Sequence, residues 1–295
     1  MKLRAKLPPM PDPFPPPFRA MLDQILRQNR RIQGGQTEVA RARHRALSQS
    51  GTFAGHRAYA PGDDLRRLDW NAYARTGSLF VKLLEEDDRR ATTVLVDASP
   101  SMLCGDPPRL VTALRLAAIL GGLSLVHLDG VHIHAGSLDL PLQGRGMVGD
   151  LLQRLASVAP HHEEPAAVVH ALLRTGGPRK VHWISDFADP AQVEPLLQLL
   201  RRSGRQVTGW LPALPSDLLA PSPGWTRVVD PESGAEHLVA VDAAMSAALV
   251  RELHLLERQQ AHAFVQAGFP LQRVHLPVQS FEAGAWLEAG WSFRR

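Results

Sequence analysis

The sequence predicts an α/β fold with a mostly parallel central sheet and helices on both of its faces. Short apolar runs without polar alternation, such as Thr92–Val96 and Val181–Ile184, are typical of strands buried on both faces of a parallel sheet. Longer segments with apolar residues at helical spacing lie between these runs. Such an alternation of strands and helices is typical of an open α/β sheet.

The same patterns place the elements in chain order. An arm dominated by proline precedes an amphipathic helix over residues 18–31, which Gly34 and Gly35 end. Further helices are expected over residues 107–125, 148–158, 166–173, 193–201, 242–267 and 281–289. Strands are expected over residues 79–84, 92–96, 131–134, 138–142, 181–184, 206–211, 227–229, 237–241 and 272–277. The segment Asp230–Gly234 is a turn, and Asp242 caps the long helix that follows the last hairpin.

The composition is that of an ordinary globular protein. The chain has 295 residues, of which 44% are hydrophobic and 21% are charged, and its formal net charge is +4. This charge permits nucleic-acid binding but does not argue for it. The single cysteine, Cys104, excludes an intrachain disulfide and fits a reducing compartment. The N-terminus lacks the apolar core of a signal peptide, and the most apolar stretch, Leu114–Leu128, is too short and interrupted to span a bilayer. We therefore expect a cytoplasmic protein without a membrane span.

Polar side chains follow the strand at residues 92–96 at every second position. Asp97, Ser99 and Ser101 stand where ligands bind in parallel sheets, just past the carboxyl end of a strand. Their hard oxygen atoms suit Mg²⁺ or Mn²⁺, and so little negative charge would leave the cation able to attract an outside carboxylate. A plain turn at Pro100 is the other interpretation. Asp186 ends a second buried strand, and it would emerge beside Asp97 if the two strands are neighbours.

The segment from Gly55 to Gly77 mixes arginines, acids and aromatic rings. The guanidinium group of arginine binds a carboxylate through two hydrogen bonds and stacks on aromatic rings. One interpretation is therefore an internal network of arginines, acids and rings. A surface that recognises a partner protein is the other. The residues that would contact a partner are Arg57, Tyr59, Asp63, Asp64, Arg66, Asp69, Trp70 and Arg75.

Two histidines, His132 and His134, share one face of a predicted strand. Such a pair can bind Zn²⁺, but no nearby third ligand is evident in the sequence. Partly buried, neutral histidines are the preferred interpretation.

Three motifs carry a family resemblance. The segment Gly55–Lys82, with its run Arg-x-Tyr-x-Pro-Gly-Asp-Asp-x-Arg-x-x-Asp-Trp-x-Ala-x-Ala-Arg-Thr-Gly, resembles the signature of the domain of unknown function 58 (DUF58) family. Residues Asp97–Met102 resemble that family's version of the metal-ion-dependent adhesion site of von Willebrand factor A domains. The turn Asp230–Gly234 resembles a recurrent family element. The resemblance covers roughly residues 34–290 and leaves the proline arm outside.

The resemblance implies a domain division. Residues 92–295 would form a Rossmann-like von Willebrand factor A domain, and residues 34–91 a family-specific segment packed on that core. Residues 1–33 would form the proline-rich arm and a short helix.

The resemblance also implies a set of metal ligands. Asp97, Ser99 and Ser101 match the first three ligands of the motif, and Asp186 matches its last carboxylate. The fourth ligand is normally a threonine, but the corresponding loop, residues 161–165, contains none. One alternative is that Glu164 or Glu163 replaces that hydroxyl, in which case the added carboxylate would weaken the pull of the cation on an acidic partner. The other is that the site binds a cation weakly or not at all.

The resemblance implies no known catalytic activity. Members of the family are commonly associated with MoxR-type AAA+ ATPases, with which they are thought to assemble or activate other proteins. We therefore predict a non-enzymatic adaptor that works with such an ATPase and an unknown client protein through a site for Mg²⁺ or Mn²⁺.

Two other functions stay open. A phosphotransfer enzyme would use Asp97 as its nucleophile, but Ser99 stands where the usual acid/base aspartate is expected. A nucleic-acid-binding module would use the N-terminal arginines Arg27, Arg30, Arg31, Arg41, Arg43 and Arg45.

Overall fold

A computed structural model of the protein describes residues 10–34, 52–60, 68–85, 91–126, 130–161, 165–174, 179–213 and 223–274. The chain forms two compact units. The first unit comprises residues 1–29 and 91–295, and the second comprises residues 30–90. The packing of residues 34–91 on the core, which the family resemblance implies, stays a prediction.

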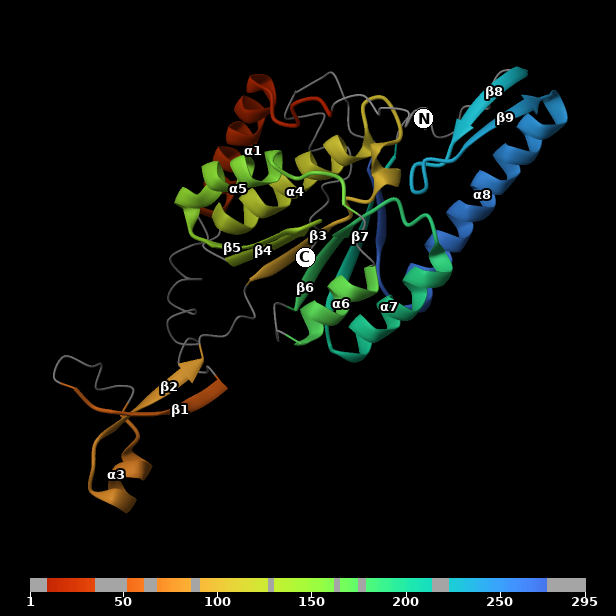
Figure 1. Ribbon diagram of the computed structural model, residues 1–295. Coiled ribbons are helices and arrows are strands. Elements are labelled where there is room, and N and C mark those ends of the chain that lie inside the picture. The colour runs from red at the N-terminus through yellow and green to blue at the C-terminus, as the bar shows by residue number, and fades with distance from the viewer. Residues whose placement is uncertain are drawn as a thin grey trace, which may run out of the picture. The chain divides into compact units, whose positions relative to one another are not determined.

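A six-stranded sheet organises the first unit, with the strand order β10–β7–β6–β3–β4–β5 (Figure 1). All neighbouring strands are parallel except β5, which lies antiparallel to β4 at one edge. The strands are β3 (Thr92–Val96), β4 (Gly130–Ala135), β5 (Leu138–Gln143), β6 (Lys180–Ile184), β7 (Gln206–Pro212) and β10 (Leu271–Val274). The predicted α/β fold with a mostly parallel sheet is confirmed, and it is consistent with a Rossmann-like architecture.

The strand β3 lies in the interior of the sheet, between β4 and β6. Its last residue, Val96, pairs with Ala135 of β4 and with Ile184 of β6. All five residues of β3 are buried, which explains why its sequence is apolar without alternation. Because β3 and β6 are parallel and in register, the segments that follow Val96 and Ile184 leave the sheet at the same edge.

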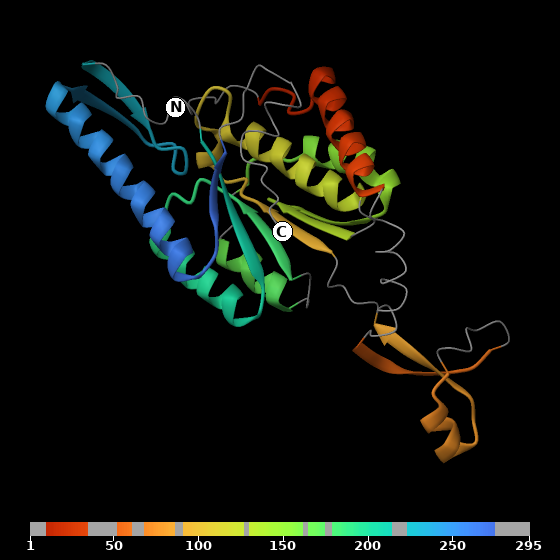
Figure 2. The same ribbon diagram turned by 180° about the vertical axis from the view of Figure 1, so that it is seen from behind.

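Helices cover both faces of the sheet. The helices α1 (Pro16–Gly34), α4 (Arg109–Val126) and α5 (Val148–Ala156) lie on one side of it, and α6 (Pro165–Arg174) and α7 (Pro190–Arg202) lie on the other (Figures 1 and 2). The long helix α8 (Ala243–Gln266) packs against α7, and the short helices η3 (Pro100–Leu103) and η4 (Arg145–Met147) complete the unit. Among the described residues, α4 is the one helix long and apolar enough to cross a membrane, and 89% of it is buried.

The described part of the proline-rich arm is anchored to the core. Phe14 and Phe18 are both 0% exposed and belong to the same apolar cluster as α4 and β3. The Nε atom of Arg115, on α4, donates a hydrogen bond to the carbonyl oxygen of Pro13 at 2.8 Å. Phe14 and Phe18 therefore anchor this part of the arm to the core.

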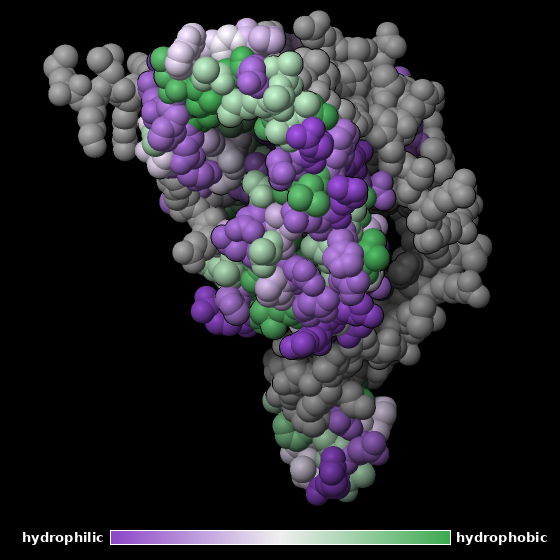
Figure 3. All heavy atoms as spheres, turned by 90° about the vertical axis from the view of Figure 1, so that its right-hand side faces the viewer, coloured by the Kyte–Doolittle hydropathy of each residue, from purple (hydrophilic) through white to green (hydrophobic). Residues whose placement is uncertain are grey.

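A hairpin precedes α8 at the far end of the chain. It consists of β8 (Gly224–Val229) and β9 (Glu236–Val241), and both strands are largely exposed. Apolar residues gather at the end of this unit where the hairpin and the start of α8 lie (Figure 3). They include Trp225 and Leu238, which are 73% and 68% exposed.

The second unit contains the described part of the family signature. The strands β1 (Thr52–Ala58) and β2 (Phe80–Glu85) pair antiparallel, and a short helix, α3 (Trp70–Thr76), lies between them in the sequence. The carboxylate of Asp69 caps α3 by accepting hydrogen bonds from the backbone N–H groups of Asn71 and Ala72.

One partly buried histidine of the sheet, His182, makes stability depend on pH. The Nδ1 atom of His182 accepts a hydrogen bond from the indole N–H of Trp210 at 3.1 Å, so the ring is neutral. Burial, with a smaller contribution from Lys180, lowers the pKa of His182 from 6.5 to about 4. Protonation therefore favours the unfolded chain. We expect the stability that His182 confers to be complete above pH 6.5 and to fall by about 2–3 kcal/mol as the pH drops toward 4.

The variant His182→Asn tests this expectation, because asparagine keeps an acceptor for Trp210 but does not titrate in this range. Urea unfolding of both proteins at several pH values should give a shallower pH dependence for the variant. The slope that remains includes His134, whose pKa burial also lowers. Identical slopes for wild type and variant would contradict the role of His182.

Candidate functional site

Three sequence-predicted site residues lie together at the carboxyl end of β3. The Oδ1 atom of Asp97 accepts a hydrogen bond from the backbone N–H of Ser99 at 2.8 Å. The hydroxyl oxygens of Ser99 and Ser101 lie 2.9 Å apart. The segment is a tight turn into η3, held by a hydrogen bond from the Met102 N–H to the Ser99 carbonyl oxygen. The turn interpretation and the site interpretation are thus compatible, since the turn is what gathers the oxygen atoms.

The neighbouring strand β6 adds Ser185 and Asp186 to the same edge. The hydroxyl of Ser185 donates to the Oδ2 atom of Asp97 at 2.7 Å. The Oδ1 atom of Asp186 accepts a hydrogen bond from the backbone N–H of Ala188 at 3.1 Å. Burial, and next the negative charge of Asp97, raise the pKa of Asp186, whereas the backbone N–H of Ala188, the positive charge of Arg109 and the hydroxyl of Ser101 lower it. The structure therefore brings together Asp97, Ser99, Ser101 and Asp186, as the strand pattern predicts.

The backbone after Asp186 is held in an unusual conformation. Phe187 has a φ of 48°, in the left-handed region that residues with a Cβ atom seldom adopt. The amide side chain of Gln260, on α8, donates to the carbonyl oxygens of Asp186 and Phe187. The buried ring of Phe187 packs edge-on against Phe264 of the same helix. These contacts fix the direction in which Asp186 leaves β6.

The turn of the β8–β9 hairpin contributes a further carboxylate. The Oε1 atom of Glu232 accepts a hydrogen bond from the backbone N–H of Ser101 at 2.9 Å. The sequence predicts the turn Asp230–Gly234 but not its position at this site, because 131 residues separate Glu232 from Ser101. Ser185 was not predicted as a site residue, although a buried strand followed by a polar pair occurs at both strand ends and could have indicated it.

The donor set fits a small, hard cation. All the side-chain donors are carboxylate or hydroxyl oxygens, which Mg²⁺ and Mn²⁺ prefer. Oxygen atoms that occupy adjacent corners of an octahedron around Mg²⁺ are ~3.0 Å apart, given Mg–O distances of ~2.1 Å. The 2.9 Å between the hydroxyl oxygens of Ser99 and Ser101 matches this spacing. Asp97, Ser99, Ser101 and Asp186 are therefore the residues that would hold the cation.

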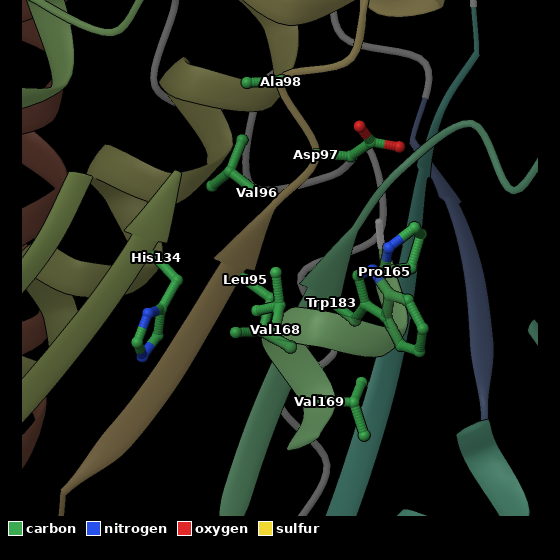
Figure 4. Close-up of a pocket in the computed structure, with 9 residues that line it drawn as sticks. All are labelled: Leu95, Val96, Asp97, Ala98, His134, Pro165, Val168, Val169 and Trp183. Carbon is green, nitrogen blue, oxygen red and sulfur yellow. The ribbon is translucent and has the colours of Figure 1, made fainter. Parts of the chain in front are cut away.

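A mostly apolar pocket lies below the site, between β3, β4, β6 and α6 (Figure 4). Asp97 stands at its upper end, and the imidazole of His134 and the ring of Trp183 lie on opposite sides, with Val168 between these two rings. The other lining residues are Leu95, Val96, Ala98, Pro165 and Val169.

The loop that was expected to supply the fourth ligand is described only at its two ends. His161 donates its backbone N–H to the carbonyl oxygen of Ala98 at 2.8 Å, and Pro165 lines the pocket together with Asp97. Glu163 and Glu164 lie outside the described residues.

The predicted partner-contact residues belong to the second unit. Trp70 is 63% exposed and its ring packs edge-on against Tyr73. Arg75 is exposed and donates to the carbonyl oxygen of Asn71, whereas Asp69 is buried as the cap of α3. Tyr59 is partly exposed and Arg57 lies in β1. Asp63, Asp64 and Arg66 lie outside the described residues.

A second group of potential metal ligands lies on the strands β4 and β5. The Nε2 atom of His132 forms a hydrogen bond with the carboxylate of Asp139, and His134 lies 3.4 Å from the same carboxylate. Ligand atoms of the three side chains lie within 4.8 Å of one another. The sequence did not reveal this third group, because the cross-strand pairing of His134 with Asp139 is a property of the hairpin register. Burial, and next His132, lower the pKa of His134, which agrees with the expected neutral ring.

Comparison with protein families identifies the chain. The profile of the family described as "Protein of unknown function DUF58" matches residues 55–262, which is more than half of the sequence. The chain belongs to the DUF58 family. The matched range includes both the Arg/Asp/Trp signature and the candidate site of this DUF58 protein, and the function of the family is not known.

Two solved structures are similar to this DUF58 protein. One is the conserved hypothetical protein BatB from Bacteroides thetaiotaomicron, at 17% sequence identity over 66% of this chain and 95% of that chain, with a TM-score of 0.39. The other is an aerotolerance-related membrane protein from Bacteroides fragilis with multiple mutations to serines. Its identity is 16% over 66% of this chain and 94% of that chain, with a TM-score of 0.37. No curated protein matches this DUF58 protein.

Proposed function

We propose that this DUF58 protein is a non-enzymatic adaptor that binds acidic side chains of other proteins through a divalent cation at the carboxyl edge of its sheet. In this proposal Asp97, Ser99, Ser101 and Asp186 hold Mg²⁺ or Mn²⁺ in a site of the von Willebrand factor A type. Glu164 is the candidate for the position where the motif normally has threonine. The cation would supply an open coordination position for a carboxylate of the partner.

The convergence of the two strand ends is the observation that carries the proposal. Asp97 and Asp186 come from neighbouring parallel strands, and the negative charge of Asp97 raises the pKa of Asp186. Two carboxylates held this close to each other are costly without a cation and favourable with one. The oxygen-only donor set adds selectivity for a hard ion.

The partner in this proposal is a MoxR-type AAA+ ATPase, with which the protein would assemble or activate a client protein in the cytoplasm. The family resemblance of the signature segment supports this choice. In the second unit, the exposed ring of Trp70 and the exposed Arg75 would provide part of the contact surface.

A titration with Mg²⁺ or Mn²⁺ tests the cation site. At a hundredfold excess over the dissociation constant, the cation should stabilise the wild-type protein by about 2.7 kcal/mol, measured by urea unfolding. The variants Asp97→Ala and Asp97→Asn should lose this stabilisation. The asparagine variant keeps an acceptor for the Ser99 N–H, so a loss of cation binding in this variant is not caused by unfolding of the turn. Asp23→Asn, at an exposed carboxylate on α1, is the matched control.

Each outcome decides the proposal. Equal stabilisation of wild type and both Asp97 variants by the cation would contradict the proposed cation site. If Asp97→Ala binds the partner ATPase as wild type does, with and without a chelator, then the cation does not bridge the two proteins. Turnover of a generic phosphoester that is abolished in Asp97→Asn would replace the adaptor with a phosphotransfer enzyme.

A further inference from the structure

The hairpin turn occupies the rim of the proposed cation site. Glu232 and Ser101 are 131 residues apart in the chain, yet the carboxylate of Glu232 accepts the backbone N–H of Ser101 at 2.9 Å. Ser101 is also a proposed ligand, and its hydroxyl oxygen lies 2.9 Å from that of Ser99. Ser101 therefore belongs to the proposed cation site through its hydroxyl and binds the Glu232 carboxylate through its backbone N–H.

The turn itself presents Glu232 in a fixed direction. The carboxylate of Asp230 accepts hydrogen bonds from the N–H of Glu232 at 3.0 Å and from the hydroxyl of Ser233. The N–H of Gly234 donates to the carbonyl oxygen of Asp230 at 2.8 Å, and Gly234 adopts a φ of 69° that suits glycine. Because Asp230 binds the turn internally, Glu232 is the acid of the turn that is directed at the site.

The charges near Ser101 explain why a cation would strengthen this arrangement. The negative charge of Asp97 raises the pKa of Asp186, and the positive charge of Arg109 acts in the opposite direction. Glu232 brings a further carboxylate to the backbone of Ser101, a residue of the proposed ligand set. A divalent cation at the site would attract all three carboxylates.

We propose that Glu232 is a built-in acidic ligand of the cation site. With the cation bound, the carboxylate of Glu232 takes the place that an acidic side chain of a partner protein must enter, so that the partner binds by displacing the β8–β9 turn. This inference rests on the proposed function, and it adds a regulator to the same site. A tethered ligand competes at a high effective concentration, so the hairpin lowers the affinity for a free carboxylate.

The comparison of Glu232→Gln with Glu236→Gln tests the inference. Glu236 is an exposed carboxylate on the same hairpin that pairs with Arg227 instead of the site. In Glu232→Gln, the dissociation constant for Mg²⁺ should rise about three- to tenfold, because the cation loses one negative charge. In Glu236→Gln it should stay at the wild-type value.

Hydrogen exchange provides a readout of the contact itself. In wild type and in Glu236→Gln, Mg²⁺ should slow exchange of the Ser101 amide by about tenfold, since the cation holds Glu232 on it. Glu232→Gln should show no such effect. An excess of sodium acetate, compared with sodium chloride at the same ionic strength, should reverse the protection in wild type by competing for the place of Glu232.

The outcomes separate this inference from the proposed function. If Mg²⁺ stabilises wild type but not Asp97→Ala, the cation site stands, and an unchanged Mg²⁺ affinity and exchange rate in Glu232→Gln then overturn the role of Glu232 alone. If Mg²⁺ affects wild type and Asp97→Ala equally, the proposed function fails and Glu232 has no cation to bind. Protection that acetate does not reverse would show that Glu232 does not compete with outside carboxylates.

Discussion

Replacing Phe18 by alanine is expected to lower the free energy of unfolding by about 3–5 kcal/mol, which is the usual cost of removing a fully buried phenylalanine ring. Phe18 is 0% exposed, and its ring centroid lies 5.5 Å from that of Phe14. The guanidinium of Arg115, which is itself buried, lies 5.7 Å from the Phe18 ring centroid. Loss of the ring would therefore leave a cavity and remove a cation–π contact with a buried cation.

Urea unfolding of the full chain measures this effect. Phe18→Leu keeps most of the apolar volume and should cost less than about 1.5 kcal/mol. Val265→Ala, at a position that is 70% exposed on α8, should stay within about 0.5 kcal/mol of wild type. A Phe18→Ala variant as stable as Val265→Ala would mean that the N-terminal arm and α1 do not belong to the core.

Local sequence patterns predicted most of the fold because the relevant signals are short in range. The apolar run at residues 92–96 is buried at every position, and the helices expected over residues 107–125 and 193–201 correspond to α4 and α7. The sequence pattern does not determine that β3 pairs with β6. The order of the strands in the sheet shows this pairing, and that order depends on how the helices pack between the strands. The helix expected over residues 281–289 lies outside the described residues.

The candidate site was predicted where it depends on strand ends and missed where it depends on distant segments. Asp97, Ser99, Ser101 and Asp186 all follow buried strands, and the register of parallel neighbours brings them together. Glu232 reaches the site from an exposed hairpin whose position no local pattern encodes. Asp139 faces His134 only through the register of β4 and β5. Such contacts are set by tertiary packing, which composition and periodicity do not record.

Replacing Gly209 by alanine is expected to cost about 3 kcal/mol or more, because the strand β7 has no room for a side chain at this position. A Cβ atom on Gly209 would lie 2.3 and 2.4 Å from two ring carbons of Phe264, and 2.9 Å from a methyl carbon of Leu271. Phe264 is 1% exposed, so its ring has no free space to enter. Either the ring or the backbone of β7 must move.

The same substitution should also weaken the cation site, because a displaced Phe264 ring would disturb a residue next to Asp186. The Phe264 ring packs at 5.0 Å from the ring of Phe187, the residue that directly follows Asp186. A shift of Phe264 therefore reaches the strained backbone that aims Asp186. We expect the Gly209→Ala variant to bind Mg²⁺ more weakly than wild type, measured by the Mg²⁺ dependence of its unfolding free energy.

The matched control is Gly149→Ala on α5, where an added Cβ meets no atom within 4 Å and alanine favours the helix. This control should be as stable as wild type or more stable, with unchanged Mg²⁺ binding. A Gly209→Ala variant that loses stability but keeps wild-type Mg²⁺ affinity would show that Asp186 is positioned independently of the packing between β7 and α8.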